Sequence, residues 1–463
     1  MRGKIKDLVS LVLILLTSPL FFFKLGASSL VSFDEAWYAG ISRNMLKSGD
    51  WFNMIWNSTP YIDHPPTGFW FQALSFKLLG VSEFSARLPS AIFALMTMVF
   101  TYLLGKKLFN RGVGLISAFA LSTAIWFTYR ARAADLDTFL TCFFVSSIYF
   151  ALKSCDHKKF LYPFAISLSF LFLTKTGIPI VIVPTIIAIF LTHKKDFKFI
   201  DLLKPFLLFI LLTGSWFIVQ YFNNQSFIDN YIRIGFPKST EPSNLKSNFD
   251  QILSYLHMGI GKWFWPSILG IVGGTIFFPR RIGTLAILCA VFFFPYVLTP
   301  RGHIWHLIPL YPFMILSFFG FTYLFIEKFT KKPLLGFIII FIFGSYFSFI
   351  QGRQIWYQFI DIPAYVSDEA ILSREAGKYP YPFFIDENYG PAAAFYSDKY
   401  VQKYSWGSLI SFFQGERPYG DAKNFTLITT QFRLNDSKIT PNMYKIIKVD
   451  RDKILLTLPN PLD

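Results

Sequence analysis

Two adjacent carboxylates, Asp34 and Glu35, follow the first long apolar segment of the chain. Residues 8–23 of that segment are apolar, and a membrane-spanning helix needs about 20 such residues. A carboxylate pair at the outer mouth of a helix bundle can hold a polar group beside the lipid and take its proton. The position and type of these residues therefore favour a transferase that works on a lipid-borne donor.

Other acids and cations stand at the ends of later apolar segments. Acids at these positions could act on a hydroxyl group and cations could bind a phosphate. If the apolar segments pack as a bundle, we expect these side chains to meet in one outer cavity. The candidates are Asp63, His64, Arg132, Asp135, Asp137, Lys175, Arg301 and His303.

A structural role is the alternative for Asp34 and Glu35. Ser32 with Glu35 three residues later matches a capping box at the start of a helix. Apolar residues recur every four positions after it, and Gly49 is a natural stop. We expect a helix over residues 36–48 that lies in the membrane interface, with Asp34 beside its first turn.

The other candidates have similar alternatives. The arginines Arg130 and Arg132 could extend to the membrane interface along their alkyl chains. One of Asp135 and Asp137 is expected only to cap the next helix, and Lys175 could complement a helix C-terminus.

The turn that holds Asp63 and His64 ends in two prolines, so it could simply be rigid. His303 and His306 lie three residues apart, as a metal pair could, but no carboxylate follows nearby.

The composition is that of a membrane protein. Of 463 residues, 53% are hydrophobic and 16% are charged, against about 25% charged in soluble domains. We predict a mainly α-helical, polytopic bundle of about eleven spans. The predicted spans are residues 7–24, 88–106, 113–129, 136–152, 160–174, 178–192, 202–222, 263–278, 282–299, 304–326 and 334–350.

The formal net charge of +16 is unevenly distributed. Every second connection is short and basic, which predicts a cytoplasmic side for these connections and for the N-terminus. The opposite loops and the tail are then extracytoplasmic, and nucleic-acid binding is disfavoured. The basic groups are Arg2, Lys4 and Lys6; Lys106, Lys107 and Arg111; Lys153, Lys158 and Lys159; Lys194, Lys195 and Lys198; Arg280 and Arg281; and Lys328, Lys331 and Lys332.

Two domains are expected. Residues 1–351 form the membrane domain, and residues 352–463, which lack a span, form a small extracytoplasmic α/β domain. Three β-rich stretches support the second domain, at residues 382–386, 425–429 and 444–449. A polar loop over residues 223–261 is expected to be flexible.

Six short stretches, in this order, resemble the dolichyl-phosphate-mannose–protein mannosyltransferases and their bacterial relatives, the lipid A aminoarabinose transferases. These are membrane glycosyltransferases of the GT-C fold. Each stretch is weakly specific alone, and together they cover most of residues 30–315. They are residues 33–39 with 48–51, 63–66 with 69–70, 84–90, 132–137, 173–177 and 309–312.

The resemblance implies inverting transfer of a sugar from a polyprenyl phosphate. Asp34 matches the catalytic acid of the first loop, and Glu35 would orient it or the acceptor. Asp137 matches the second-loop acid, with Asp135 as its rival, and Lys175 matches the third-loop lysine.

The remaining matches are cationic or neutral side chains. His64 stands where relatives often have lysine, and Arg301 and His303 stand where relatives place a basic residue. Arg87 lies within a matched stretch. These residues and Arg132 are the predicted contacts of the donor phosphate or its surroundings.

Two other functions remain open alternatives. A flippase or transporter would place ionisable residues at the midplane and show inverted repeats, and neither is evident. An oligosaccharyl transferase would carry a large external domain with a Trp-Trp-Asp motif, and no Trp-Trp pair occurs. The sugar, the acceptor (glycolipid, protein or envelope glycan), the need for divalent metal and the oligomeric state stay open.

Overall fold

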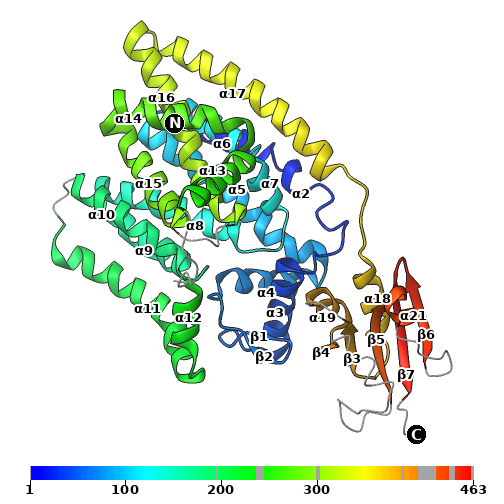
Figure 1. Ribbon diagram of the computed structural model, residues 1–463. Coiled ribbons are helices and arrows are strands. Elements are labelled where there is room, and N and C mark those ends of the chain that lie inside the picture. The colour runs from blue at the N-terminus through cyan, green and yellow to red at the C-terminus, as the bar shows by residue number, and fades with distance from the viewer. Residues whose placement is uncertain are drawn as a thin grey trace. The chain divides into compact units, whose positions relative to one another are not determined.

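The computed structural model describes residues 2–192, 197–235, 245–298, 303–386, 390–404, 424–436 and 444–459. Its helices and strands are labelled in Figure 1. The contacts divide the chain into two compact units. The first unit is Met1–Leu25, Ile62–Gly68 and Arg87–Ile362, and the second is Gly26–Tyr61, Phe69–Ala86 and Pro363–Asp463.

The first unit is built of helices. They are α1 (Arg2–Leu15), α2 (Pro19–Phe22), most of α5 (Glu83–Leu108), α6 (Arg111–Leu121), α7 (Ile125–Ala131), α8 (Asp137–Asp156), α9 (Leu161–Phe172), α10 (Val183–Thr192), α11 (Phe199–Asn223), α12 (Phe227–Gly235), α13 (Leu245–Ile260), α14 (Phe264–Phe277), α15 (Pro279–Val297), α16 (Tyr311–Thr330) and α17 (Pro333–Ile355). Short 3₁₀ or π turns join them: η1 (Lys158–Phe160), η2 (Ile178–Ile182), η3 (Gly261–Trp263), η4 (Ile304–Leu310) and η5 (Trp356–Ile360).

Each predicted span is helical over most of its length. Among the described residues, seven helices are long and apolar enough to cross a membrane. The pair α6 and α7, bent by 70°, would be an eighth. The protein is thus a multi-pass membrane protein, in which helices satisfy every backbone group internally. The count of eleven spans stays a prediction.

Helices α8 and α16 form the interior of the first unit. In each of these two segments, 83% of the apolar 18-residue stretch that could cross a membrane is buried inside the protein. Gly270 of α14 allows close approach to α16, because a Cβ there would lie 2.3 Å from the Cα of Phe318. Small residues of this kind let membrane helices pack backbone to backbone. The buried start of α8 is where the polar side chains described below gather.

The second unit combines the first loop with the C-terminal residues. Its elements are α3 (Asp34–Ser48), β1 (Ile55–Trp56), β2 (Thr59–Pro60), most of α4 (Thr67–Leu79), α18 (Asp368–Ala376), β3 (Phe383–Asp386), α19 (Pro391–Ser397), β4 (Val401–Tyr404), β5 (Asn424–Thr430), α21 (Gln431–Asp436), β6 (Lys445–Asp450) and β7 (Lys453–Pro459). Helix α3 packs on α19 and on β1.

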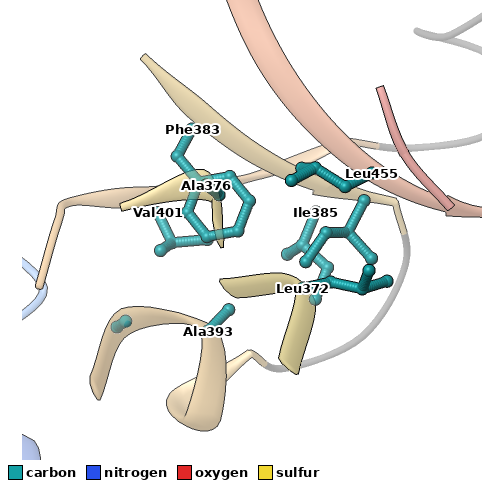
Figure 2. Packing of buried hydrophobic residues seen from close by; sticks show 9 residues of the cluster. Leu372, Ala376, Phe383, Ile385, Ala393, Val401 and Leu455 are labelled. Carbon is teal, nitrogen blue, oxygen red and sulfur yellow. The ribbon is translucent and has the colours of Figure 1, made fainter. Parts of the chain in front are cut away.

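The C-terminal part is the predicted small α/β fold. Its five strands are ordered β4-β3-β5-β7-β6. Strands β3, β4 and β5 are parallel, and β7 is antiparallel to both β5 and β6. Figure 2 shows how apolar side chains of α18, α19 and the sheet pack together. The boundary predicted between residues 351 and 352 stays a prediction, and segments 26–61 and 69–86 join this unit.

Two local predictions were wrong. Helix α3 begins at Asp34 with Phe33 as N-cap and no side-chain cap, so the capping box is absent. The Ser32 hydroxyl donates instead to Glu369, at 3.0 Å, and Glu35 accepts from the Val31 N–H.

The loop expected to be flexible contains helices α12 and α13. Ile252 and Leu256 of α13 are buried, so packing of one apolar face stabilises helix in a segment that is polar on average.

Candidate active site

The break between helices α7 and α8 positions the two acids Asp135 and Asp137. Arg130 lies in the last turn of α7, which ends at Ala131, and Asp137 begins α8. Between them, the carboxylate of Asp135 accepts the backbone N–H of Asp137 at 2.9 Å. An acid at a helix start complements the helix dipole. Asp135 thus satisfies the first backbone N–H of α8, and the carboxylate of Asp137 has other partners.

Asp137 lies between two cations. Its Oδ1 accepts from Nζ of Lys175 at 2.7 Å. Its Oδ2 accepts from Nε and Nη2 of Arg130 at 3.0 and 2.9 Å. The Arg130 guanidinium also pairs with Asp135 and lies over the Trp305 ring, 5.0 Å from its centroid.

These ion pairs are buried. The side chain of Asp137 is 1% exposed, and those of Arg130 and Lys175 are 10% and 8% exposed. Desolvating such charges costs several kcal/mol each, so the arrangement persists only because the partners are close and hydrogen-bonded. We name Arg130, Asp135, Asp137 and Lys175 the Asp137 centre.

The Asp63–His64 turn packs against the Lys175 turn. The Thr176 hydroxyl donates to the Asp63 carbonyl, and the Thr67 N–H donates to the Leu173 carbonyl at 2.9 Å. Burial, and then the charge of Lys175, lower the pKa of His64 to about 3. His64 is thus neutral at neutral pH and can offer a phosphate a hydrogen bond, but not a charge.

Asp63 itself is half-buried. Burial raises the pKa of its carboxyl group, and the charge of Arg233 opposes that shift. Its backbone carbonyl, rather than its carboxylate, holds the two turns together.

Three aromatic or imidazole side chains surround the Asp137 centre. His306 of η4 and two tyrosines, Tyr296 and Tyr311, interact electrostatically with Asp137. His303 is exposed at the start of η4, where its N–H donates to Nδ1 of His306 at 3.4 Å. Within the described ranges, no group of three His, Cys, Asp or Glu gathers as a metal site would.

Arg132 and Arg87 hold the backbone at and just beyond the end of the first span. Arg132 donates to the Leu20 carbonyl at 3.3 Å, and Arg87 donates to the Leu25 carbonyl at 3.0 Å. Burial, and then the nearby charge of Arg87, lower the pKa of Arg132 to about 10. Both arginines anchor a chain segment here, and their predicted contact with a donor phosphate stays a prediction.

Asp34 and Glu35 begin α3 in the second unit. Asp34 is half-buried, while Glu35 is 6% exposed and accepts from Val31 at 2.9 Å. Glu35 therefore organises its own loop. The expectation that Asp34 shares a cavity with Lys175 stays a prediction. Arg301, a predicted phosphate contact, lies outside the residues that the structure describes.

Arg130 is the residue that sequence reasoning undervalued. It was expected to extend to the membrane interface, whereas its guanidinium is buried and binds Asp137 and Asp135. The available signal was its position in the last turn of a helix, immediately before a break that ends in an acid.

Comparisons with known proteins show which proteins the chain resembles. The family model described as dolichyl-phosphate-mannose-protein mannosyltransferase matches residues 63–219. That range includes His64, Arg130, Asp137 and Lys175.

Two curated relatives match part of the chain. An uncharacterized protein of Aquifex aeolicus is 30% identical over 220 residues, 46% of this chain and 44% of that protein. An undecaprenyl phosphate-alpha-4-amino-4-deoxy-L-arabinose arabinosyl transferase of Pectobacterium carotovorum is 30% identical over 149 residues, 32% of this chain and 27% of that protein. The chain thus spans less than half the length of these relatives.

Solved structures of ArnT from Cupriavidus metallidurans match nearly the whole chain. ArnT from Cupriavidus metallidurans bound to undecaprenyl phosphate superposes with a TM-score of 0.74 at 15% identity, over 97% of both chains. The protein therefore has a fold of the GT-C class, as the sequence predicted. Within that class, the predicted resemblance to the dolichyl-phosphate-mannose–protein mannosyltransferases and their aminoarabinose-transferase-like branch is confirmed.

Proposed function

We propose that the protein is an inverting glycosyltransferase that moves a sugar from a polyprenyl phosphate to an acceptor outside the bacterial inner membrane. The observation that carries this proposal is the buried Asp137 centre, in which Asp137 fixes the Lys175 ammonium. The hydrogen bond to Asp137 uses one of the three Nζ protons, so Lys175 can donate the others to a phosphate oxygen. The undecaprenyl phosphate bound in the structurally similar ArnT supports a donor of this class.

The proposed reaction is a single displacement. The acceptor oxygen attacks the anomeric carbon of the donor sugar, and the bond from that carbon to the phosphate oxygen breaks. Asp34 takes the acceptor proton, and polyprenyl phosphate leaves with the bonding electron pair. Attack from the face opposite the leaving group inverts the anomeric carbon. If the acceptor is itself an ionised phosphate, no proton is removed, and Asp34 positions the acceptor instead.

The cations of the Asp137 centre would stabilise the departing phosphate. Fixed charges in a water-poor site are often the largest contribution to catalysis. Lys175 supplies the nearest proton donors, Arg130 holds Asp137 in place, and neutral His64 adds a hydrogen bond. Arg301 and His303 are further proposed phosphate contacts.

The basic connections support a cytoplasmic N-terminus, and the polar loops and C-terminal residues would then face outward. A glycolipid resembling lipid A, a protein hydroxyl and an envelope glycan are the acceptor classes we propose. The relatives named as aminoarabinose transferases favour the glycolipid.

Mass spectrometry of envelope glycolipids and glycoproteins tests the proposal. We compare cells that lack the protein with cells that make it, its Asp34→Asn variant, or a matched Asp229→Asn control at an exposed position on α12. Envelope molecules that are heavier by the mass of one sugar should appear only in cells that make the wild type or the Asp229→Asn control. Loss of a general base typically lowers the rate 10²- to 10⁴-fold, so Asp34→Asn should give little product at normal protein level. Wild-type product from Asp34→Asn would refute the base role, and identical envelopes in all cells would refute the transferase.

A further inference from the structure

A cavity of about 460 Å³ lies wholly within the second unit. Its walls come from α3, the β1–β2 hairpin, and the chain between α19 and β4, which are labelled in Figure 1. Ligand sites commonly have volumes of roughly 300–1,000 Å³ and a few fixed polar groups. The cavity contains none of the residues of the Asp137 centre.

Arg43 forms a buried cationic wall of this cavity. It is 7% exposed, and its Nη2 donates to the Ala394 carbonyl and pairs with Asp398, both at 3.2 Å. Its Nη1 donates to the Phe395 carbonyl. Its Nε–H has no acceptor within the described part of the chain. Since buried donors are nearly always satisfied, this N–H points to a missing acceptor.

The cavity lining is positively charged overall. It contains the cations Arg43 and Lys47 and one carboxylate, Asp398. Lys399 also lines the cavity, but its Nζ donates to the carbonyls of Tyr379 and Tyr381, which lie outside the lining. The side chain of Lys47 is 54% exposed and that of Asp398 is 49% exposed, so their ion pair is open to water. An anion could compete for such an exposed pair at little cost, because exposed pairs contribute only about 0–1 kcal/mol.

The hairpin supplies the aromatic and polar side of the cavity. Asn57 and Ser58 both have positive φ, 44° and 65°, a conformation in which glycine is usual. The Asn57 side chain holds this turn, because it accepts from the Val401 N–H at 2.8 Å and donates to its carbonyl at 2.7 Å. Ser58 and Trp56 of this hairpin both line the cavity.

Tyr400 lines the cavity from the chain just before β4 and is 51% exposed. An electron-rich ring face suits the C–H groups of a sugar ring, and amide and hydroxyl groups suit its hydroxyls. Cations beside aromatic rings therefore fit a sugar that carries a negative charge better than a free anion or a neutral sugar.

We propose that this cavity binds an anionic sugar unit, one that carries a phosphate or a carboxylate. Such a unit could be a free glycan phosphate or the headgroup of a phosphorylated glycolipid, and the chemistry of recognition is the same. The proposal concerns binding alone and goes beyond the transfer reaction proposed above.

Titration calorimetry on the purified full-length protein tests this proposal without any polyprenyl donor. The probes are glucose 6-phosphate, glucuronate, neutral glucose, inorganic phosphate and a phosphorylated glycolipid in nanodiscs. The variants are Lys47→Gln and Tyr400→Ala, both at exposed positions. The matched control is Lys77→Gln, which is exposed on α4 and outside the cavity.

We expect an anionic sugar to bind at least about tenfold more tightly than glucose or inorganic phosphate. Lys47→Gln and Tyr400→Ala should each weaken binding about three- to tenfold, and Lys77→Gln should not. Binding of both glucose 6-phosphate and the glycolipid would assign the site to free sugar phosphates as well as to lipid headgroups. Binding of the glycolipid alone, weakened by Lys47→Gln, would assign it to a lipid headgroup. Equal affinity for glucose, equal affinity for inorganic phosphate, or affinities unchanged by both variants would overturn the proposal. Because no donor is present, none of these results depends on whether the protein transfers a sugar.

Discussion

The two units each hold a carboxylate between two cations. In the first unit, Asp137 lies between Arg130 and Lys175. In the second, Asp398 lies between Arg43 and Lys47. The residue types are nearly the same, but the exposed fraction of the carboxylate side chain is 1% for Asp137 and 49% for Asp398.

This difference in burial decides what each centre can do. Removing one partner from a buried pair leaves an uncompensated charge, at a cost of about 3–5 kcal/mol, whereas water replaces a lost partner at the surface. Loss of one partner from the Asp137 centre is therefore costly, and the intact centre presents a fixed cation. The Asp398 pair contributes little to stability and can exchange its partners for a ligand.

The largest effect should follow from Asp137→Asn. This change leaves Lys175 buried without a carboxylate partner, and we expect destabilisation by about 3–5 kcal/mol. Thermal unfolding of the purified protein in detergent measures the effect as a lower midpoint.

A second substitution separates lost charge pairing from lost packing. In the double variant Asp137→Asn with Lys175→Met, the unpaired ammonium is gone, so the unfolding temperature should recover in large part. Transfer activity should stay absent, because the double variant lacks the Lys175 ammonium that is proposed to bind the phosphate of the sugar donor. An unfolding temperature for Asp137→Asn equal to that of the wild type would contradict the assigned role of burial.

Local patterns predicted much of the fold but less of the Asp137 centre. Apolar runs predicted the helices because spanning helices are specified by composition along one segment. Gly49 correctly ended α3, where it adopts a φ of 70°. By contrast, Ser32 matches a capping box, yet its hydroxyl binds Glu369, which lies 337 residues later. A competing partner at such a distance leaves no local trace.

The same limit explains the choice between two arginines. Arg130 and Arg132 lie two residues apart, and their roles depend on where α7 ends. Because the helix ends at Ala131, Arg130 binds Asp137 and Arg132 binds the Leu20 carbonyl. Sequence could indicate that one cation would pair with an acid, but the pairing itself depends on a bend between two helices.

An intermediate effect should come from the pH dependence of His64. Its pKa is about 3 in the folded protein and about 6.5 in an unfolded chain. Between these values the unfolded state binds more protons, so His64 makes the protein less stable as pH falls from about 6.5 toward 3. The physical cause is burial beside Lys175, where a second cation is unfavourable.

Unfolding temperatures of the wild type and His64→Gln between pH 7.5 and 4.5 measure this contribution. The wild type should lose stability more steeply on acidification than His64→Gln. A control variant, His257→Gln, changes an exposed histidine of α13 and should keep the wild-type slope. Parallel curves for His64→Gln and the wild type would show that His64 is protonated without cost and that its surroundings tolerate another charge.

The smallest effect on stability should follow from Asp398→Asn, the counterpart of Asp137→Asn in the second unit. Asp398 has a φ of 58°, which asparagine also tolerates, so the backbone of the turn should persist. The exposed pairs should cost at most about 1 kcal/mol on removal. Since the cavity then keeps Arg43 and Lys47 and loses its one carboxylate, the affinity for glucose 6-phosphate should rise severalfold at low salt. High salt should diminish that gain, because screening weakens charge interactions at exposed sites. A large fall in unfolding temperature would mean that the two centres are equivalent despite their different burial, and unchanged affinity would mean that Asp398 does not oppose an anion in the cavity.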